Sequence, residues 1–158
     1  MMRVKLDEID RIILRELLAD GRITNVELAK RAGISAPPCL RRVRALEEAG
    51  ILVGYHADVD QKSLGFEVTV FAMISLHSQA DADLTAFQDA IDGWPYVREA
   101  HMLSGEIDFM LRCVAPDMDA FQRFVIEDLT AAPNVAGVRT SLALRQTKYE
   151  PGVPIEGV

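Results

Sequence analysis

Residues 24–50 read TNVELAKRAGISAPPCLRRVRALEEAG, and this stretch decides how the N-terminal part of the chain folds. Its apolar residues recur at helical spacing in two segments that end at Gly33 and Gly50. Glycine closes helices because it readily adopts the left-handed conformation. Thr24 followed three residues later by Glu27 is typical of a capping box at a helix start. Two short helices joined by a tight turn predict a helix-turn-helix.

The second of these helices starts with two prolines, Pro37 and Pro38, directly after Ala36. The first N–H groups of a helix have no partner inside the helix, so a proline there removes a donor that is not needed. Ser35 is expected to be the N-cap, with its hydroxyl accepting a hydrogen bond from an N–H of the first turn. The prolines therefore predict a helix start and not a break.

At about 100° per residue, the second helix divides into two faces. The face predicted to be buried carries Ala36, Cys39, Leu40, Val43 and Leu46. In a helix-turn-helix, the start of the second helix approaches base edges in the major groove, and arginine suits guanine edges and phosphates. The residues expected to bind double-stranded DNA are Ser35, Ala36, Pro37, Pro38, Arg41, Arg42 and Arg44. The alternative is a solvated basic face with no partner.

Charge is distributed unevenly around this stretch. The net charge of the chain is −7, yet residues 1–65 hold 11 Lys and Arg against 10 Asp and Glu, while residues 66–158 hold 6 against 14. Between Lys30 and Arg44 there are five cations and no acid. An asymmetry of this kind indicates that one end of the chain faces nucleic acid.

The composition indicates a globular protein of the cytoplasm. The chain has 158 residues, of which 49% are hydrophobic, and its two cysteines, Cys39 and Cys113, form no disulfide framework. The N-terminal MMRVKLDEIDR lacks the apolar segment of a secretory signal. No stretch approaches the roughly 18 apolar residues that span a membrane, so we expect no membrane partner.

Two domains are expected, with a boundary near residue 60. LDEIDRIILRELLADG, residues 6–21, predicts a further helix before the helix-turn-helix, and ILVGYHADVD, residues 51–60, predicts a hinge strand. Residues 1–60 should therefore form a three-helix, winged-helix-like DNA-binding domain. In residues 61–158 the pattern predicts a ferredoxin-like β-α-β-β-α-β domain, an α+β fold with both helices on one face of an antiparallel sheet. Its strands are predicted at 67–76, 97–103, 108–114 and 135–149, and its helices at 81–94 and 117–132.

The first strand of the second domain carries apolar residues on both faces. If Val70 and Ile74 face the helices, Phe71 and Met73 lie on the open face of the sheet. Apolar side chains there indicate that a second subunit covers the face, so we expect a homo-oligomer. The alternative is that two exposed apolar residues are ordinary.

Two stretches are similar to the Lrp/AsnC (leucine-responsive, feast/famine) transcription regulators. Residues 20–55, DGRITNVELAKRAGISAPPCLRRVRALEEAGILVGY, resemble the DNA-binding half of that family, and residues 102–121, MLSGEIDFMLRCVAPDMDAF, resemble its effector-sensing half. The resemblance implies dimers built through the C-terminal sheets, which assemble further, so that the expected homo-oligomer is a dimer or a multiple of dimers. It also implies paired helix-turn-helix units on DNA and a response to an amino acid. It places that amino acid between subunits, near the turn from Ser104 to Asp108.

The turn offers what a zwitterionic amino acid needs. Gly105 lets the backbone approach a ligand, and N–H groups near Ser104 and Gly105 suit a carboxylate. Asp108 is expected to meet the ammonium group, while Met102 and Leu103 form an apolar wall. Read without the resemblance, the turn is an ordinary hairpin.

The resemblance adds Met118 and residues 141–143 to this site with less support. Phe109 stands where the family often has tyrosine, and Ser141 where an aromatic residue often occurs. Polar groups in a pocket decide which side chain it accepts, so both differences bear on the identity of the ligand.

An enzyme is the reading that the sequence favours least. The histidines His56, His77 and His101 have no metal-ligand spacing and no nucleophile-and-base pattern, and no glycine-rich phosphate loop is present. We therefore expect no catalytic residues, no cofactor and no metal. The predicted function is a sequence-specific transcription regulator that responds to an amino acid. The alternative is an architectural DNA-coating protein with little effector response.

Overall fold

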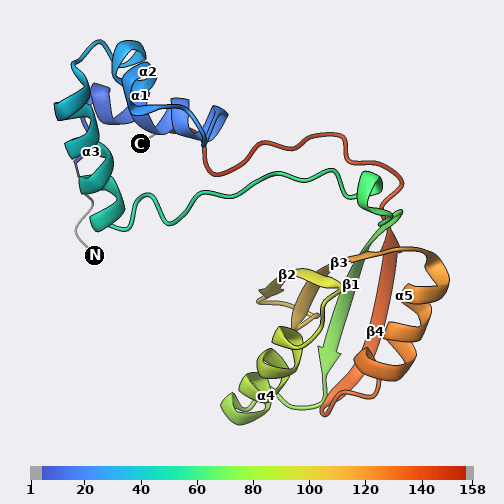
Figure 1. The fold of residues 1–158 in the computed structure, drawn as a ribbon. Coiled ribbons are helices and arrows are strands. Elements are labelled where there is room, and N and C mark those ends of the chain that lie inside the picture. Colours follow the sequence, from blue (N-terminus) through green and yellow to red (C-terminus); the bar gives the residue numbers. More distant parts are fainter. Residues whose placement is uncertain (1–4, 156–158) are drawn as a thin grey trace. The chain divides into compact units, whose positions relative to one another are not determined.

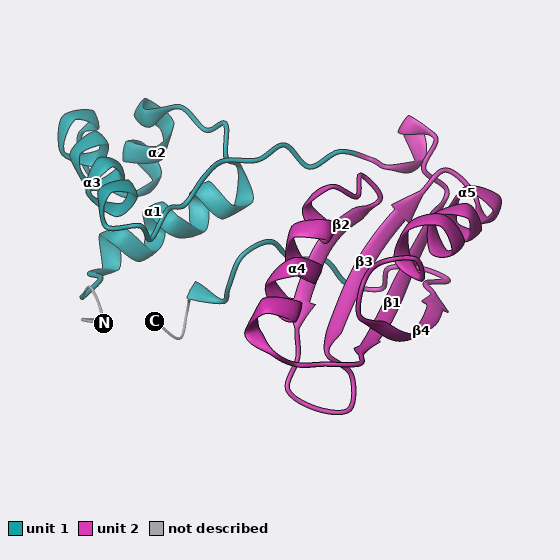
Figure 2. Cartoon of the chain, turned by 90° about the horizontal axis from the view of Figure 1, so that it is seen from below, with its two compact units in different colours: residues 1–59, 148–158 teal, residues 60–147 magenta. Residues whose placement is uncertain are grey.

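The computed structural model describes residues 5–155 (Figure 1). Residues 1–4 and 156–158 lie outside the described part. Residues 1–4 begin the N-terminal stretch MMRVKLDEIDR, in which we expected no secretory signal. The chain divides into two compact units, residues 1–59 with 148–158 and residues 60–147, coloured separately in Figure 2. The described residues 148–155, which we expected in the second domain, thus group with the first unit.

The first unit contains three helices, α1 (Glu8–Ala19), α2 (Asn25–Arg31) and α3 (Ala36–Glu48). The expected helix-turn-helix is confirmed: Gly33, with φ of 70°, lies in the four-residue turn between α2 and α3. At the start of α2, Thr24 Oγ1 accepts a hydrogen bond from the N–H of Glu27 at 3.3 Å. The buried core of the unit comprises Ile13, Leu14, Leu28, Ala29, Ala32, Cys39, Leu46 and Ile155.

The prediction of a hinge strand at residues 51–60 is wrong, because these residues form no strand in the structure. Strands persist only when their N–H and C=O groups pair with a neighbouring strand. The apolar side chains of Val53 and Val59 are 90% and 64% exposed, so no packing compensates for the missing ladder.

The second unit alternates strands and helices in the expected order. Its elements are β1 (Val68–Leu76), α4 (Asp81–Asp92), β2 (Val97–Met102), β3 (Phe109–Ala115), α5 (Met118–Phe124) and β4 (Val135–Leu142). Helix α5 continues as a π-helical segment, η2 (Val125–Leu129), and a short 3₁₀ helix, η1 (Lys62–Leu64), precedes β1. The strands lie in the order β2-β3-β1-β4, and all neighbours are antiparallel. This is the predicted ferredoxin-like arrangement.

Both helices of the second unit cover the same face of the sheet (Figure 2). Val70 and Ile74 of β1 are buried against aromatic side chains, with the rings of Phe87 and Phe109 4.9 Å apart. Trp94, the only tryptophan of the chain, lies 5.6 Å from Phe124. The tight aromatic core fixes the sheet against α4 and α5.

The opposite face of the sheet carries no helix of this unit. Phe71 and Met73 of β1 are half-buried there, and their cross-strand neighbours in β3 are Arg112 and Met110. Arg112 Nε donates to Glu99 Oε1 at 2.7 Å. The face is therefore apolar along its middle and charged toward β2.

Strand β4 is shorter than the predicted 135–149. Strand β1 begins at Val68, and the last pair between the two strands is Val70 with Leu142. One further hydrogen bond joins the N–H of Ala143 to the carbonyl of Thr69 at 2.9 Å. Beyond this point β1 offers no partner, so the chain leaves the sheet.

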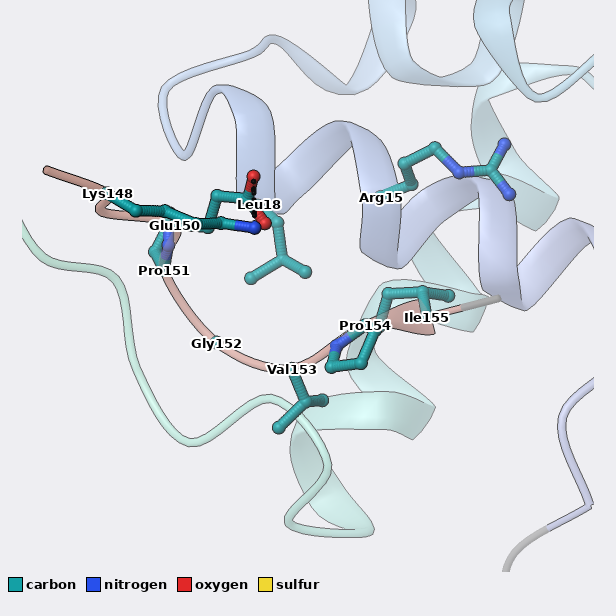
Figure 3. A pocket seen from close by; sticks show the side chains of 9 residues that line it. All are labelled: Arg15, Leu18, Lys148, Glu150, Pro151, Gly152, Val153, Pro154 and Ile155. Carbon is teal, nitrogen blue, oxygen red and sulfur yellow. Dashed lines mark ion pairs between the residues drawn. The ribbon is translucent and has the colours of Figure 1, made fainter. Parts of the chain in front are cut away.

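Residues 148–155, which we name the C-terminal strap, pack against α1 of the first unit (Figure 3). Ile155 is only 7% exposed and belongs to the core of that unit. Gly152 has φ of 73°, and a Cβ at this position would lie 2.7 Å from Leu18 Cδ2. The strap leaves a hollow of about 530 Å³ beside Arg15 and Leu18, and its Lys148 and Glu150 form an ion pair at 3.3 Å.

None of the described helices is long and apolar enough to cross a bilayer. The longest of them, α3, has 13 residues.

Candidate nucleic-acid interface and effector site

Helix α3 begins at Ala36, as the two prolines predict, but its start is held differently from our expectation. Ser35 occupies the N-cap position with extended backbone, yet its side chain makes no capping hydrogen bond. Asn25, the first residue of α2, instead donates from Nδ2 to the carbonyl of Ala36 at 2.9 Å. An amide on α2 therefore connects the starts of the two helices.

The buried face of α3 agrees with the helical wheel except at one edge. Cys39 and Leu46 are 0% and 4% exposed, and burial raises the pKa of the Cys39 thiol. The prediction that Leu40 is buried on this face is wrong, because its side chain is 39% exposed. Its position at the margin of the apolar stripe accounts for the difference, since α2 covers the centre of that stripe.

The outer face of α3 presents the residues predicted to bind DNA. Pro37, Arg41 and Arg44 are exposed, while Ala36, Pro38 and Arg42 are partly buried. A shallow hollow of about 400 Å³ on this face is lined by Pro38, Arg41, Arg42 and Ala45. Within residues 5–155, Arg41 and Arg44 form no ion pair and no side-chain hydrogen bond. Their guanidinium groups are thus available to an anionic partner.

Arg42 differs from its neighbours because its guanidinium already has anionic partners. Its Nη1 donates to Asp7 Oδ2 and to Asp10 Oδ1, each at 2.7 Å. Asp7 is the N-cap of α1, and Asp10 completes a capping box with it. The pair raises the pKa of Arg42, while the backbone N–H of Asp10 and then Arg42 lower the pKa of Asp7. Sequence reasoning missed this contact, although two aspartates three residues apart at a helix start are a capping signal.

A second arginine of the cation run is occupied in the same way. Arg31 Nη1 donates to Glu16 Oε2 at 2.7 Å, and its Nε donates to Glu27 Oε1 at 3.1 Å. The bond to Glu16 links α2 to α1, whereas the bond to Glu27 lies within α2. The run of five cations is therefore not a uniform basic surface, because Arg31 and Arg42 hold helices together.

The predicted effector turn connects β2 to β3. Ser104 and Gly105 are exposed, and Gly105 has φ of 155°, a conformation that favours glycine. The apolar side chains before them are accessible, with Met102 59% and Leu103 37% exposed. These four residues lie together and face solvent, as a ligand site requires.

The side chain of Asp108, in contrast, is buried and does not face solvent. It is 8% exposed, its Oδ2 accepts from the N–H of Leu76 at 2.7 Å, and its Oδ1 accepts from Gln79 Nε2 at 2.8 Å. The geometry therefore does not support the expected contact between Asp108 and a ligand ammonium. Asp108 instead ties the turn to the segment after β1. Gln79 was missed because only the fold brings it to a residue 29 positions away.

The remaining candidates do not meet the turn within one chain. The turn precedes the start of β3, whereas Met118 follows the other end of that strand. The turn follows β2 and residues 141–143 end β4, and these strands are the two opposite edges of the sheet. Three strand spacings separate them by about 14 Å. A single site that uses both edges requires two copies of the chain.

Comparisons with known proteins match a family to each of the two units. Residues 6–53 match the winged helix-turn-helix DNA-binding family, and residues 69–153 match the Lrp/AsnC ligand binding domain. The leucine-responsive regulatory protein of Rhizobium meliloti is 59% identical over 148 residues, covering 94% of this chain and 95% of that protein. The transcriptional regulator AzlB of Bacillus subtilis is 39% identical over 155 residues, covering 98% and 99%.

Solved structures of other regulators superimpose on more than nine-tenths of the chain. A transcriptional regulator from Neisseria meningitidis, solved in complex with L-methionine, superimposes with a TM-score of 0.92 at 34% identity, covering 97% of this chain and 99% of that one. AsnC of Escherichia coli superimposes with a TM-score of 0.84 at 28% identity, covering 93% and 97%.

Proposed function

Because the chain belongs to the Lrp/AsnC family of DNA-binding transcription regulators, we propose that it binds specific operator sequences and that an amino acid alters this binding. The observation that carries the proposal is the combination of an exposed basic helix in one unit with an open glycine turn in the other. We assign DNA binding to residues 1–60, with the C-terminal strap as part of that unit. Sensing and oligomerisation are assigned to the ferredoxin-like unit.

On the DNA side, we propose that the start of α3 enters the major groove. Ser35, Ala36, Pro37 and Pro38 form a narrow tip, in which two positions lack an N–H and one has only a methyl side chain. Arg41 and Arg44 follow on the same outer face and are free of ion pairs within the described residues. Arginine at such positions either reads a guanine edge or binds phosphate.

On the effector side, we propose that the turn after β2 binds the backbone groups of an amino acid. The N–H groups near Ser104 and Gly105 suit its carboxylate, and Met102 and Leu103 suit an apolar side chain. The L-methionine bound to the Neisseria relative and the leucine-responsive name of the Rhizobium relative support an apolar amino acid. Asp108 shapes the turn without touching the ligand.

A thermal-shift screen of the twenty amino acids tests this proposal. A ligand at 100 times its dissociation constant should add about 2.7 kcal/mol to the free energy of unfolding, and an apolar amino acid should give the largest shift. Gly105→Ala should abolish the shift, because the added Cβ disfavours the φ of 155° that shapes the turn. Gly65→Ala is the matched control, since it introduces the same kind of strain at φ of 81° away from the turn. If no amino acid shifts the wild-type protein, the effector assignment is wrong.

We also propose that a second copy of the chain covers the open face of the sheet. The supporting observation is the apolar middle of that face, formed by Phe71, Met73 and Met110. A dimer would also supply the second sheet edge that a site shared by β2 and β4 requires. We expect the assembly to act in the cytoplasm, where its two buried, unpaired cysteines stay reduced.

Phe71→Glu should break this assembly, because it places a charge in the centre of the apolar face. Static light scattering at micromolar concentration should then give the mass of a monomer, whereas the wild type gives at least a dimer. Ala82→Glu, on the exposed surface of α4, should leave the mass unchanged. A wild-type protein that is already monomeric would contradict the proposed oligomer.

A further inference from the structure

Arg42 lies in a closed network with the start of α1. The N–H of Asp10 donates to Asp7 Oδ1 at 2.9 Å, and the N–H of Asp7 donates to Asp10 Oδ2 at 3.1 Å. The other oxygen of each carboxylate accepts from Arg42 Nη1 at 2.7 Å. All four carboxylate oxygens are therefore used, and each faces a defined donor.

The charge balance of this network does not favour a phosphate. Two carboxylates face one guanidinium, so the cluster carries a net negative charge. A phosphate that approached Arg42 would also approach Asp7, whose side chain is 53% exposed. Arg41 and Arg44 on the same helix have no such acidic neighbour within ion-pair distance among residues 5–155. DNA phosphates should therefore contact these two arginines and avoid Arg42.

The network also connects two helices that otherwise approach each other at few points. The backbone of α3 comes closest to α2, and the Arg42 side chain reaches from the middle of α3 to the first turn of α1. The Asp10 carboxylate is only 16% exposed, so this contact is largely shielded from water and salt. Bonds between charged groups are short and directional, which suits them to fix the rotation of a helix.

We propose that Arg42 is a positioning residue that sets the orientation of α3 through Asp7 and Asp10, and that it does not bind DNA. The inference rests on the proposed function, since it concerns how the DNA-binding helix is presented. It divides the basic face of α3 into two roles: Arg41 and Arg44 contact DNA, and Arg42 holds the helix that carries them. Loss of Arg42 should misplace the base contacts without removing a phosphate contact.

The salt dependence of DNA binding distinguishes the two roles. The full-length protein is first used to select a duplex from a randomised pool, and affinities for the selected and the random duplex are measured against salt concentration. Arg42→Met, which keeps the apolar stem, should leave the slope of log K against log salt unchanged, whereas Arg41→Met should lower its magnitude by about 0.9 for each DNA-bound subunit if Arg41 binds phosphate. Arg42→Met should also reduce the ratio of selected to random affinity at least about fivefold. This is the lower end of the effect of one lost base contact. A slope whose magnitude falls by about 0.9 for each DNA-bound subunit in Arg42→Met overturns the proposal.

Asp10→Asn provides a test that removes no positive charge. Asparagine keeps an acceptor for the capping box but loses the ion pair, so the ratio of selected to random affinity should fall as in Arg42→Met. Glu8→Gln, on the same helix and also losing one negative charge, is the control and should keep the wild-type ratio. An unchanged ratio in Asp10→Asn overturns the proposal even if Arg42→Met does not fold. Failure of the wild type to enrich any duplex would contradict the proposed function itself, and the positioning role with it.

Discussion

Replacing Arg41 and Arg44 together with alanine should weaken DNA binding more than any other pair of exposed substitutions. Both guanidinium groups lie on the outer face of α3, and neither forms an ion pair within the described residues. If both bind phosphate, the magnitude of the salt slope should fall by about 1.8 for each DNA-bound subunit, and all sequences should be affected alike. If one reads a guanine edge, about 1–3 kcal/mol should be lost at one base pair of the operator.

Measurements on the single variants assign these roles. A phosphate contact lowers the slope for selected and random duplexes equally, whereas a base contact lowers only the affinity for the selected duplex. Arg98→Ala is the control, because Arg98 is an exposed arginine on β2 in the other unit. It should retain the wild-type slope. Wild-type affinity and slope in the double variant would show that the outer face of α3 is not the DNA-binding surface.

Ile155→Ala should destabilise the DNA-binding unit although the residue lies near the end of the chain. Ile155 is 7% exposed in the core formed by α1, α2 and α3, and truncating a buried isoleucine costs about 2–5 kcal/mol. The helical signal of the first unit in far-UV circular dichroism should melt at a lower temperature. Fluorescence of Trp94, which packs in the core of the second unit, should keep its transition.

Val153→Ala is the matched control for this prediction. Val153 lies in the same strap but is 65% exposed, so its truncation should change the free energy of unfolding by less than about 0.5 kcal/mol. If Ile155→Ala and Val153→Ala behave alike, the strap is not part of the core of the first unit.

The helices and the order of the elements along the chain could be predicted from the sequence because each element follows from a local pattern. Gly33 and Gly50 mark helix ends, and the prolines after Ser35 mark a helix start, so each signal lies within a few residues of the boundary that it marks. The apolar alternation in β1 likewise needs no distant information. Patterns of this kind are enforced by the backbone itself.

The incorrect predictions concern residues whose state depends on a distant partner. Residues 51–60 and 144–149 have strand-like composition, but no neighbouring strand pairs with them in the structure. Ile155 is a single apolar residue in a segment rich in proline and glycine, so no periodicity marks it as core. These outcomes are set by tertiary contacts that overrule local preference.

The candidate sites were predicted only by residue type. The sequence placed a charged residue at the effector turn, Asp108, and another on the predicted DNA-binding face, Arg42. It did not indicate which donors and acceptors surround them. Leu76 at the end of β1 and Gln79 beyond it bind Asp108, and the acids at the start of α1 bind Arg42 across 32 and 35 residues. Buried or paired charges take the partners that the fold brings to them, which no local spacing reveals.

The measurement that tests the central claim most directly is the affinity of the wild-type protein for selected and random duplexes. Fluorescence anisotropy should be recorded with and without the amino acid that gives the largest thermal shift. We predict that the selected duplex binds at least about 10³ times more tightly than the random one, and that the amino acid changes this affinity by about 5- to 150-fold. Equal affinities that do not respond to any amino acid would contradict the account and favour a DNA-coating protein.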